Sequence, residues 1–473
     1  MAKLNGNDTS KALFKNTGII AIGQVSTKIV NFLLLPLYTA LLSAEEYGLV
    51  DVLSTYSSFI VVVVSLQMAQ AAFRFLVTCR TDETEKTEVI STITASSLCA
   101  LGVYSGIFIF IQPFINLSYK WFLLFHVASS LLLQLSSNIA RGLGHNADYA
   151  IGNFISASTA ILLNVITIAV LRLDVGAMLV SHVIGHIVGS LFMIFRCHLL
   201  KYVRIHQFSI DKLKVIINYS LPLVPNEISW SVIHASDRLV VQQFLDLAAN
   251  GLIAVASKFS VIYTTAFSIF NTSWTEQVVL HYNDEGGADY ISQMFNKMVT
   301  FFATVAIGII ACMPFLFGIL VNKKFSQAYE LVPWYMIAVF FNAIIGMLSS
   351  IYLINNETKK IATSTMIAAV INLAIDLLLI KIVGVYAAPI SSICGYATIS
   401  VWRYIDVNRR YCKIAFNQIN LFILISVLAL SLWTYHSGNL YFQIFNLIIV
   451  VICAVFLNKA FLNEIRGIIA KKG

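Results

Sequence analysis

Long apolar stretches alternate with short polar segments along the whole chain. A membrane-spanning helix needs roughly 20 mostly apolar residues. The stretches are continuous runs of Leu, Ile, Val and Phe, not the alternating strands of a membrane β-barrel. The pattern therefore predicts an all-α polytopic membrane protein with about fourteen transmembrane helices. The predicted helices cover residues 17–42, 49–73, 89–115, 121–140, 149–171, 175–195, 215–245, 248–275, 298–320, 331–354, 361–380, 384–402, 418–436 and 441–457.

The composition supports this class of protein. Of the 473 residues, 58% are hydrophobic and 11% are charged, whereas about a quarter of a soluble chain is charged. Most Lys and Arg fall at the termini and in the loops after even-numbered helices, for example Arg403, Arg409 and Arg410 after residue 402. The positive-inside rule therefore predicts a multi-pass protein with both termini in the cytoplasm. The net charge of +8 reflects this face and does not indicate nucleic-acid binding.

Several functional classes find no support in the sequence. The seven cysteines are scattered, with no C-x-x-C pair and no His companion at ligand spacing, so no disulfide framework, metal site or cofactor is expected. The chain has no G-x-x-x-x-G-K-[ST] loop for nucleotide hydrolysis. It also has no large loop with the paired carboxylates or activated nucleophile of an enzyme. We therefore expect a protein that moves a solute and is not an enzyme.

The two halves of the chain repeat each other weakly. A shift of 203 residues aligns residues 42–57 with 245–260, and a shift of 208 aligns Asn164 with Asn372. An even repeat unit of six helices gives two parallel lobes, an arrangement known in transporters with the solute path between the lobes. The predicted domains are an N-terminal lobe at 1–210, a C-terminal lobe at 211–406, and an appended helix pair with a cytoplasmic tail at 407–473.

Polar and ionisable side chains form stripes along several predicted helices. An ionisable group at mid-membrane costs at least about 2.5–3.5 kcal/mol, so it usually faces a cavity or a partner. Lys28, Arg238 and Lys258 are such cations, in the first, seventh and eighth helices. Further polar residues lie on the same helix faces: Gln24 and Asn31 on the first helix, Glu227, Ser231, His234 and Gln242 on the seventh, and Thr265 and Thr272 on the eighth. Gln67, Gln70 and Arg74 line the cytoplasmic end of the second helix. We expect these faces to line a wet, positively charged central cavity.

Structural explanations compete with a cavity role for the three cations. Arg238 lies toward the outer end of its helix, and a snorkelling Arg paired with the neighbouring Asp237 fits the sequence equally well. Lys28 and Lys258 also fit structural lysines bonded to backbone carbonyls or to Glu227. What favours the cavity is the occurrence of three such cations on helices at equivalent places in the two lobes.

The remaining ionisable groups have alternatives as well. Glu227 follows Pro222 and Pro225, which interrupt the helix ladder, so its carboxylate also fits a role in satisfying the freed backbone groups. His234 also fits a hydrogen-bonded core residue. Asp376 is compatible with a site that binds an ion or a proton, and also with an ion pair to Lys381.

Several motifs resemble those of the polysaccharide biosynthesis proteins, a family that includes the Wzx-type O-unit flippases. The segment LSAEEYGL at 42–49 is similar to the family's L-s-x-x-E-Y-G-L signature. Further matches at about the family's spacings are Ser220–Pro225, the pair Asp237-Arg238, the block from Gly251 to Lys258, and the basic loop NNETKK at 355–360. One departure is Ile253, where the family has Tyr. The resemblance covers nearly the whole chain.

The resemblance implies a fold similar to multidrug and toxic compound extrusion transporters, with two lobes in a V around a central cavity. It implies translocation of a polyprenyl-diphosphate-linked oligosaccharide, an O-antigen or related unit, to the outer leaflet of the bacterial inner membrane. Alternating access with ion or proton counterflow goes with that activity, and a glycan polymerase and a chain-length regulator are the protein partners it suggests. The expected diphosphate and cavity residues are Lys28, Arg238, Lys258, Gln24, Asn31 and Arg74, and the expected coupling residues are Glu227, His234 and Asp376.

Two other functions stay open at the level of sequence. A drug or metabolite antiporter of the same fold usually takes cationic substrates, which favour a cavity dominated by carboxylates. A non-transporting scaffold for glycan-assembly enzymes is the other. The buried cations favour an anionic lipid head over both, because Arg and Lys suit a diphosphate through bidentate contacts and compact charge.

Overall fold

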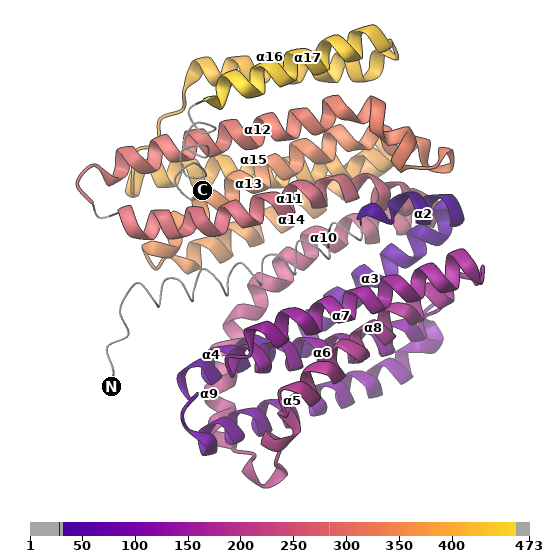
Figure 1. Ribbon diagram of the computed structural model, residues 1–473, viewed down its shortest axis with the longest axis vertical. Coiled ribbons are helices and arrows are strands. Elements are labelled where there is room, and N and C mark those ends of the chain that lie inside the picture. Colours follow the sequence, from indigo (N-terminus) through magenta and orange to yellow (C-terminus); the bar gives the residue numbers. More distant parts are fainter. Residues whose placement is uncertain (1–27, 29–31, 283, 460–473) are drawn as a thin grey trace, which may run out of the picture. The chain divides into compact units, whose positions relative to one another are not determined.

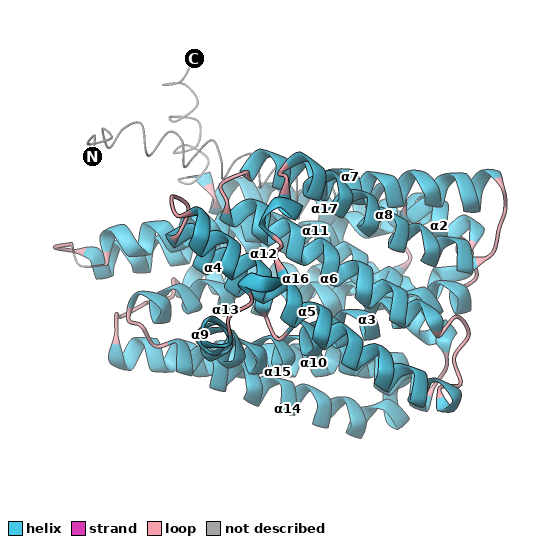
Figure 2. Cartoon of the chain, turned by 90° about the horizontal axis from the view of Figure 1, so that it is seen from below, coloured by secondary structure: helices cyan, strands magenta, loops and turns pink. Residues whose placement is uncertain are grey.

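The structure is a computed structural model that describes Lys28, residues 32–282 and residues 284–459. Helices joined by short loops make up this described part, and no strand occurs within it (Figure 1, Figure 2). The chain forms two compact units, one of Met1–Leu42 with Glu46–Arg238, the other of Ser43–Glu45 with Leu239–Gly473. The division falls inside a helix, whereas the lobes predicted from the sequence meet at residues 210 and 211.

Unit 1 holds the helices of the first half of the chain. They are α2 (Leu35–Leu41), α3 (Ala44–Ser65), α4 (Met68–Thr78), α5 (Glu83–Ile111), α6 (Trp121–Gly142), α7 (Asn146–Asn164), α8 (Val175–Arg196), α9 (Ile210–Ser220) and the first part of α10 (Val224–Phe244). A π-helical segment, Val165–Val170, extends α7. The side chain of Asp82 begins α5 by accepting hydrogen bonds from the backbone N–H groups of Thr84 and Glu85, which satisfies donors that a helix start leaves unpaired.

Unit 2 holds the remaining helices. They are the rest of α10, α11 (Leu247–His281), α12 (Gly287–Leu320), α13 (Val332–Ile354), α14 (Thr358–Val383), α15 (Ala387–Arg410), α16 (Gln418–Ser437) and α17 (Leu440–Leu457). The last two lie side by side and pack against α12 (Figure 1). Asn417 and Asn439 begin them as N-caps, each accepting from backbone N–H groups of the first turn.

Eleven helical segments of the described part are long and apolar enough to cross a membrane. One of them, Thr358–Arg410, contains both α14 and α15. The predicted helix at 215–245 is not among the eleven, and it carries Glu227, Asp237 and Arg238 close together. The predicted first helix lies mostly outside the described residues. The total of fourteen is consistent with these segments and stays a prediction.

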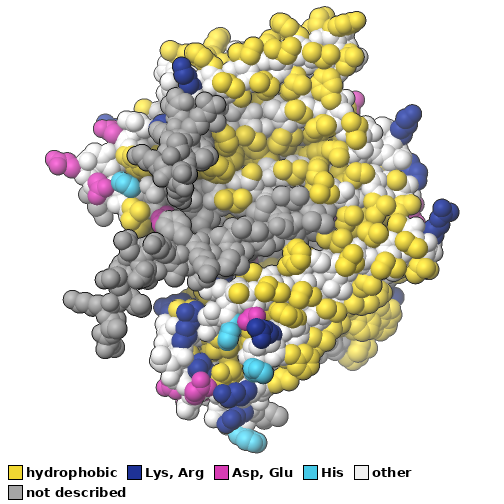
Figure 3. Space-filling model, in the orientation of Figure 1, with side chains coloured by type: hydrophobic (Ala, Val, Ile, Leu, Met, Phe, Trp, Pro, Cys, Tyr) yellow, Lys and Arg dark blue, Asp and Glu magenta, His cyan; other side chains and the backbone are white. Residues whose placement is uncertain are grey.

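The outer surface of the units suits a lipid environment. Large apolar side chains are exposed along the helices, with Phe110 at 80%, Phe114 at 87% and Ile382 at 76%. In the face shown in Figure 3, hydrophobic side chains cover the flanks of the helices, and most charged side chains lie toward helix ends. A soluble protein rarely exposes contiguous apolar surface on this scale, so the chain is a multi-pass membrane protein.

The second predicted helix, 49–73, is interrupted in the structure. Leu66 and Gln67 have φ values of 45° and 57°, in the left-handed region that a bulky residue rarely adopts. The break separates α3 from α4. Apolar pattern alone gives no sign of it, because hydrophobic residues continue on both sides of the break.

Small residues allow close packing of α7 against α8 in unit 1. A Cβ added to Gly189 would meet Ser156 Cβ at 2.5 Å and the Gly152 carbonyl oxygen at 2.7 Å, and one added to Gly185 would meet the Ser156 carbonyl oxygen at 2.6 Å. The two backbones therefore approach more closely than larger side chains permit, a common packing mode of membrane helices.

Arg403 corrects the assignment of basic residues to loops. It lies within α15 with none of its surface exposed, not in the loop after residue 402. Its Nη1 donates to Ser349 Oγ of α13 at 2.6 Å, and its Nε and Nη2 donate to Ser364 Oγ of α14 at 3.0 and 2.7 Å. The guanidinium thus joins three helices, since its five donors can serve several acceptors at once.

Candidate functional site

A polar cavity of about 400 Å³ lies within unit 1. It is formed by α3, the break after it, α4, α6 and the first turns of α10. The lining residues are Ser58, Val61, Val62, Ser65, Gln67, Ala69, Gln70, Ser130, Gln134, Asn138, Glu227 and Ser231. Its volume is within the range of small-ligand pockets, although most such pockets are lined chiefly by apolar side chains.

Backbone irregularities shape two walls of this cavity. The left-handed Leu66 and Gln67 end α3 and start α4 on a new axis, which brings Gln67 and Gln70 to the cavity wall. On the other side, Pro222 and Pro225 come just before the cavity residues of α10. The carbonyl of Pro225 accepts a hydrogen bond from Ser229 Oγ at 2.7 Å.

The cavity wall is rich in amides and hydroxyls. The side chains of Gln70 and Gln134 are exposed, and that of Glu227 is half-buried. Asn138 Nδ2 donates to the Gln134 backbone carbonyl at 2.9 Å. The amide oxygen of Asn138 can therefore accept a hydrogen bond from another donor. Each amide can donate and accept. Among the described residues the lining holds one carboxylate, no Lys or Arg and no aromatic ring, so the wall suits a neutral, hydroxyl-rich ligand.

A histidine pair adjoins the cavity through Ser130. The hydroxyl of Ser130 lies 3.2 Å from Nδ1 of His186 on α8 and 3.5 Å from Nδ1 of His126 on α6. The two imidazole rings are 5.0 Å apart between centroids. Because Ser130 also lines the cavity, a hydrogen-bonded chain connects the imidazoles with the cavity wall. Neither histidine was among the residues predicted from the sequence.

Arg238 has a partner that the sequence did not indicate. Its Nε lies 2.8 Å from Oδ2 of Asp51 on α3. The side chains are 11% and 21% exposed respectively, so the pair is largely withdrawn from solvent. The sequence was compatible either with an unpaired Arg238 in the cavity or with an ion pair between Arg238 and Asp237. The structure places a further carboxylate, that of Asp51, against the guanidinium, from a residue far away in the sequence.

The other predicted cations lie on different helices of the two units. Lys28 is helical and exposed in unit 1, and Arg74 on α4 is exposed and is not part of the cavity lining. Lys258 is half-buried on α11 of unit 2. Gln24 and Asn31 lie outside the described residues. Convergence of Lys28, Arg238 and Lys258 on one central cavity therefore stays a prediction.

Of the three predicted coupling residues, the structure places Glu227 in the cavity wall. Asp376 lies on α14 with none of its surface exposed, one turn from Asn372, whose amide donates to Ser391 Oγ at 3.1 Å. Lys381, its alternative partner in the sequence, lies over the ring of Phe244 at 5.4 Å. His234 is on α10, and its side chain is outside the described atoms.

A sequence signal for the missed cavity residues existed on the fourth predicted helix. Ser130, Gln134 and Asn138 follow one another at intervals of four, which places them on one face of a helix. None of them is ionisable. They were therefore not predicted, because the candidate residues were selected around ionisable side chains in the predicted helices.

The cysteines acquire neighbours that their spacing does not show. All seven are free thiols. The sulfur of Cys197, the carboxylate of Asp148 and the imidazole of His145 lie within 4.8 Å of one another. Spacing along the chain predicted no metal ligand set, because Cys197 is distant in sequence from His145 and Asp148. His145 and Asp148 lie three residues apart at the start of α7, and the fold brings Cys197 to them from the end of α8.

Comparisons with known proteins identify the family and the fold. Residues 13–275 match the family of polysaccharide biosynthesis proteins. The succinoglycan biosynthesis transport protein ExoT of Rhizobium meliloti (strain 1021) is 24% identical over 263 residues, which cover 54% of this chain and 51% of that protein. The chain thus matches about half the length of this relative.

Solved structures resemble the whole chain at low sequence identity. The lipid II flippase MurJ in an inward closed conformation has a TM-score of 0.72 at 16% identity, covering 94% of this chain and 99% of that one. An inward-facing multidrug resistance MATE family transporter of the MOP superfamily has a TM-score of 0.60 at 14% identity, covering 82% and 98%. These likenesses confirm the predicted all-helical fold.

Proposed function

The chain belongs to the polysaccharide biosynthesis protein family, and from that premise we propose that it is a flippase for a polyprenyl-diphosphate-linked oligosaccharide. The substrate is an O-antigen or related repeat unit, moved from the cytoplasmic to the outer leaflet of a bacterial inner membrane by alternating access. The observation that carries this proposal is the amide- and hydroxyl-lined cavity of unit 1.

The cavity is assigned to the glycan. Sugars present many hydroxyl groups, each able to donate and accept a hydrogen bond. Exposed Gln70 and Gln134 and half-buried Glu227 offer matching groups from three different helices, so one sugar can be held from several directions. A diphosphate does not fit this wall, because its charge would repel the carboxylate and meet no compensating Lys or Arg within it.

The diphosphate is assigned to the cations outside the cavity. Lys28 and Lys258 are the main candidates, with Gln24, Asn31 and Arg74 as further contacts. Arg238 is expected to contribute less than the sequence suggested, because Asp51 already compensates its charge at 2.8 Å. The polyprenyl chain would remain in lipid, so only the polar head passes through the protein.

Ion or proton coupling is assigned to Glu227, with His234 and Asp376 as further candidates. Half-buried Glu227 shares the proposed glycan cavity, so its protonation state alters the charge that the substrate meets. Chains of Asp, Glu and His serve as proton relays in membrane transporters, and Ser130 with His126 and His186 forms such a chain beside the cavity.

The membrane orientation and the partners are part of the same proposal. Both termini are placed in the cytoplasm, on the basis of the distribution of Lys and Arg. A glycan polymerase and a chain-length regulator are proposed as partners beside the lipid bilayer and the lipid-linked glycan. The assigned activity is transport without a cofactor, and nucleic acid is no part of it.

One observation favours a second candidate function. The cavity contains the carboxylate of Glu227 and no cationic side chain among the described residues, which suits the cationic substrates of a drug or metabolite antiporter. Lipophilic cations, however, are usually recognised by aromatic faces, and the described lining contains none. We therefore rank the antiporter below the flippase.

A complementation assay tests the glycan assignment. A strain deleted for the gene receives wild type, Gln70→Leu, Gln134→Leu or the double variant, and surface glycan is measured at matched expression. The double variant is expected to lower export at least about tenfold, since it removes hydrogen-bonding groups on two walls, each worth about 1 kcal/mol. Gln418→Ala, an exposed glutamine at the start of α16 in unit 2, is the matched control.

Two further measurements separate the alternatives. Normal glycan from the double variant would overturn the cavity assignment. Normal glycan from Lys28→Ala with Lys258→Ala would overturn the cation assignment. Cells that accumulate a cationic dye only when Glu227 is replaced by Gln, with unchanged glycan, would instead support the antiporter.

A further inference from the structure

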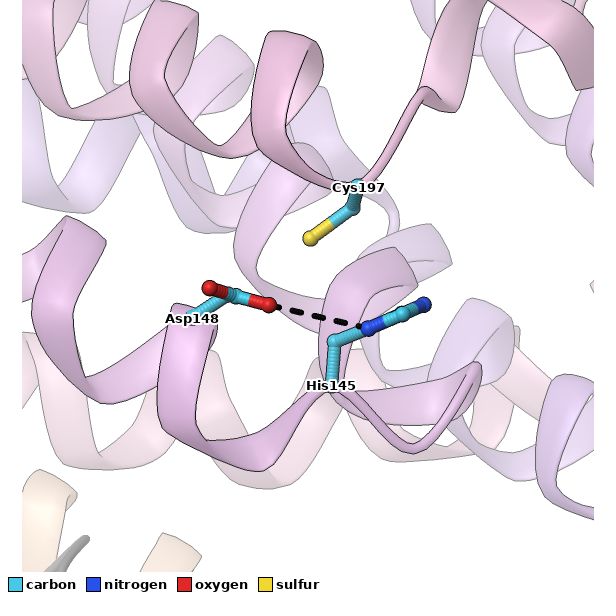
Figure 4. Close-up of side chains that lie close together, drawn as sticks. All are labelled: His145, Asp148 and Cys197. Atoms are coloured by element: carbon cyan, nitrogen blue, oxygen red, sulfur yellow. Dashed lines mark ion pairs between the residues drawn. The ribbon is translucent and has the colours of Figure 1, made fainter.

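Three side chains with different donor atoms point toward a common centre at one end of unit 1 (Figure 4). His145 immediately precedes α7, Asp148 lies in the first turn of α7, and Cys197 immediately follows α8. Their donor atoms lie within 4.8 Å of one another. This cluster is separate from the glycan cavity and takes no part in the proposed transport function.

The spacing of the donors is close to that of a tetrahedral metal site. Bonds of about 2.0–2.3 Å from Zn²⁺ to N, O and S ligands place neighbouring ligands of a tetrahedron about 3.4–3.7 Å apart. The distance from His145 Nδ1 to Asp148 Oδ2 is 3.6 Å. Because all three donors lie within 4.8 Å of one another, closing the site on a metal requires the farthest pair to approach by about 1.1–1.4 Å at most.

Arg196 positions the carboxylate without occupying the oxygen that faces the cluster. Its Nε lies 3.4 Å from Oδ1 of Asp148, while Oδ2 faces His145. A ligand that binds Oδ2 alone leaves the pair with Arg196 in place. Hydrogen-bonded partners on the second oxygen commonly orient carboxylate ligands, so Arg196 acts as an orienting group and not as a competitor.

Burial and charge favour a divalent ion of borderline softness. Cys197 is 4% exposed, while the side chain of His145 is 47% exposed, which provides an entry path to a shielded sulfur. Binding displaces the thiol proton, so a thiolate and a carboxylate both face the metal, and the carboxylate is shared with Arg196. Sulfur with imidazole selects Zn²⁺ and related transition metals over Mg²⁺ or Ca²⁺, which prefer oxygen ligands.

We propose that His145, Asp148 and Cys197 bind Zn²⁺, with water in the fourth position. Three protein ligands and one open position are typical of an exchangeable site, because structural zinc sites usually have four protein ligands. The metal joins the α6–α7 connection to the end of α8, so binding restrains relative movement of these helix ends.

Zinc binding to the purified full-length protein tests this proposal. The protein in detergent micelles is titrated with Zn²⁺ alone against a chromogenic chelator, and with Co²⁺ to detect absorption from a metal–thiolate bond. The variants are His145→Ala, Cys197→Ser and both together. His198→Ala, next to Cys197 in the chain, and Cys79→Ser, a buried cysteine of the same unit at 2% exposure, are the matched controls.

Wild type and both controls are expected to bind one Zn²⁺ more than the double variant does. Each single variant should bind that ion at least about 100-fold more weakly, since loss of even an orienting partner costs 10–100-fold. Added Zn²⁺ should raise the thermal midpoint of wild type and controls only.

Two results would overturn the proposal. One is equal zinc uptake by wild type and the double variant. The other is a Co²⁺ complex without thiolate absorption. His145→Ala changes a half-exposed side chain and should fold normally, so its zinc affinity gives an answer even if Cys197→Ser fails to fold. No outcome depends on the transport activity, so the flippase assignment stands or falls separately.

Discussion

Replacing Arg238 and Asp51 by alanine, singly and together, is expected to reveal a strong energetic coupling inside unit 1. The two groups approach to 2.8 Å, and their side chains are 11% and 21% exposed. Each single substitution leaves the other charge in a poorly solvated place without the partner that faces it at 2.8 Å. The double substitution removes both charges and should therefore cost less than the sum of the two.

The expected magnitude lies between two limits. Coulomb attraction at 2.8 Å is about 6 kcal/mol gross at an effective dielectric constant of about 20, and most of it is offset by desolvation of the two groups. Truncating one partner of a fully buried pair costs about 3–5 kcal/mol, while exposed pairs are worth about 0–1 kcal/mol. At this burial we expect a coupling energy of about 2 kcal/mol.

A double-mutant cycle measures this coupling. Wild type, Asp51→Ala, Arg238→Ala and the double variant are unfolded by denaturant in detergent micelles, and the free energies of unfolding are compared. Residues that share one ion pair are expected to be non-additive. Additive effects, with a coupling below about 0.5 kcal/mol, would refute the view that this pair stabilises unit 1.

The charge-reversed pair Asp51→Arg with Arg238→Asp then separates structure from substrate binding. If Arg238 acts mainly through Asp51, the reversed pair should recover most of the stability and most of the surface glycan that Arg238→Ala loses. A reversed pair that is stable but exports no glycan would show that the positive charge itself, at position 238, contacts the substrate.

Substitutions at Arg403, Gly189 and Trp274 test the packing within each unit. Arg403→Lys should destabilise by about 3–5 kcal/mol and Arg403→Met by less, because an ammonium keeps the buried charge but cannot replace all the guanidinium bonds; equal melting of Arg403→Lys and wild type would contradict this. Gly189→Ala should cost about 1–3 kcal/mol by forcing α7 from α8, while Gly102→Ala, with nothing within 4 Å of the added Cβ, should not destabilise in the same unfolding assay. Trp274→Phe removes a buried hydrogen bond from the indole Nε1 to the Met347 carbonyl at 2.9 Å and should cost about 1 kcal/mol, measured as a shift of the denaturant midpoint.

The sequence by itself determined the class of protein, the helical architecture and the family. Continuous apolar runs leave a spanning chain little choice but the helix, because backbone groups must bond within the segment when no water is present. The motifs at 42–49, 220–225, 237–238 and 251–258 pointed to the family that residues 13–275 match. The buried amides Asn164 and Asn372, aligned by the repeat, indeed lie at 1% and 0% exposure.

Only the tertiary structure decided which polar groups meet. Asp51 is distant from Arg238 in sequence, as Ser130 is from His186 and His145 from Cys197, and periodicity along one helix gives no information about contacts between helices. The break at Leu66 and Gln67 depends in the same way on packing around it, since local apolar pattern continues through the break. A buried charge therefore reveals from sequence alone that a partner is needed, and the fold reveals which residue supplies it.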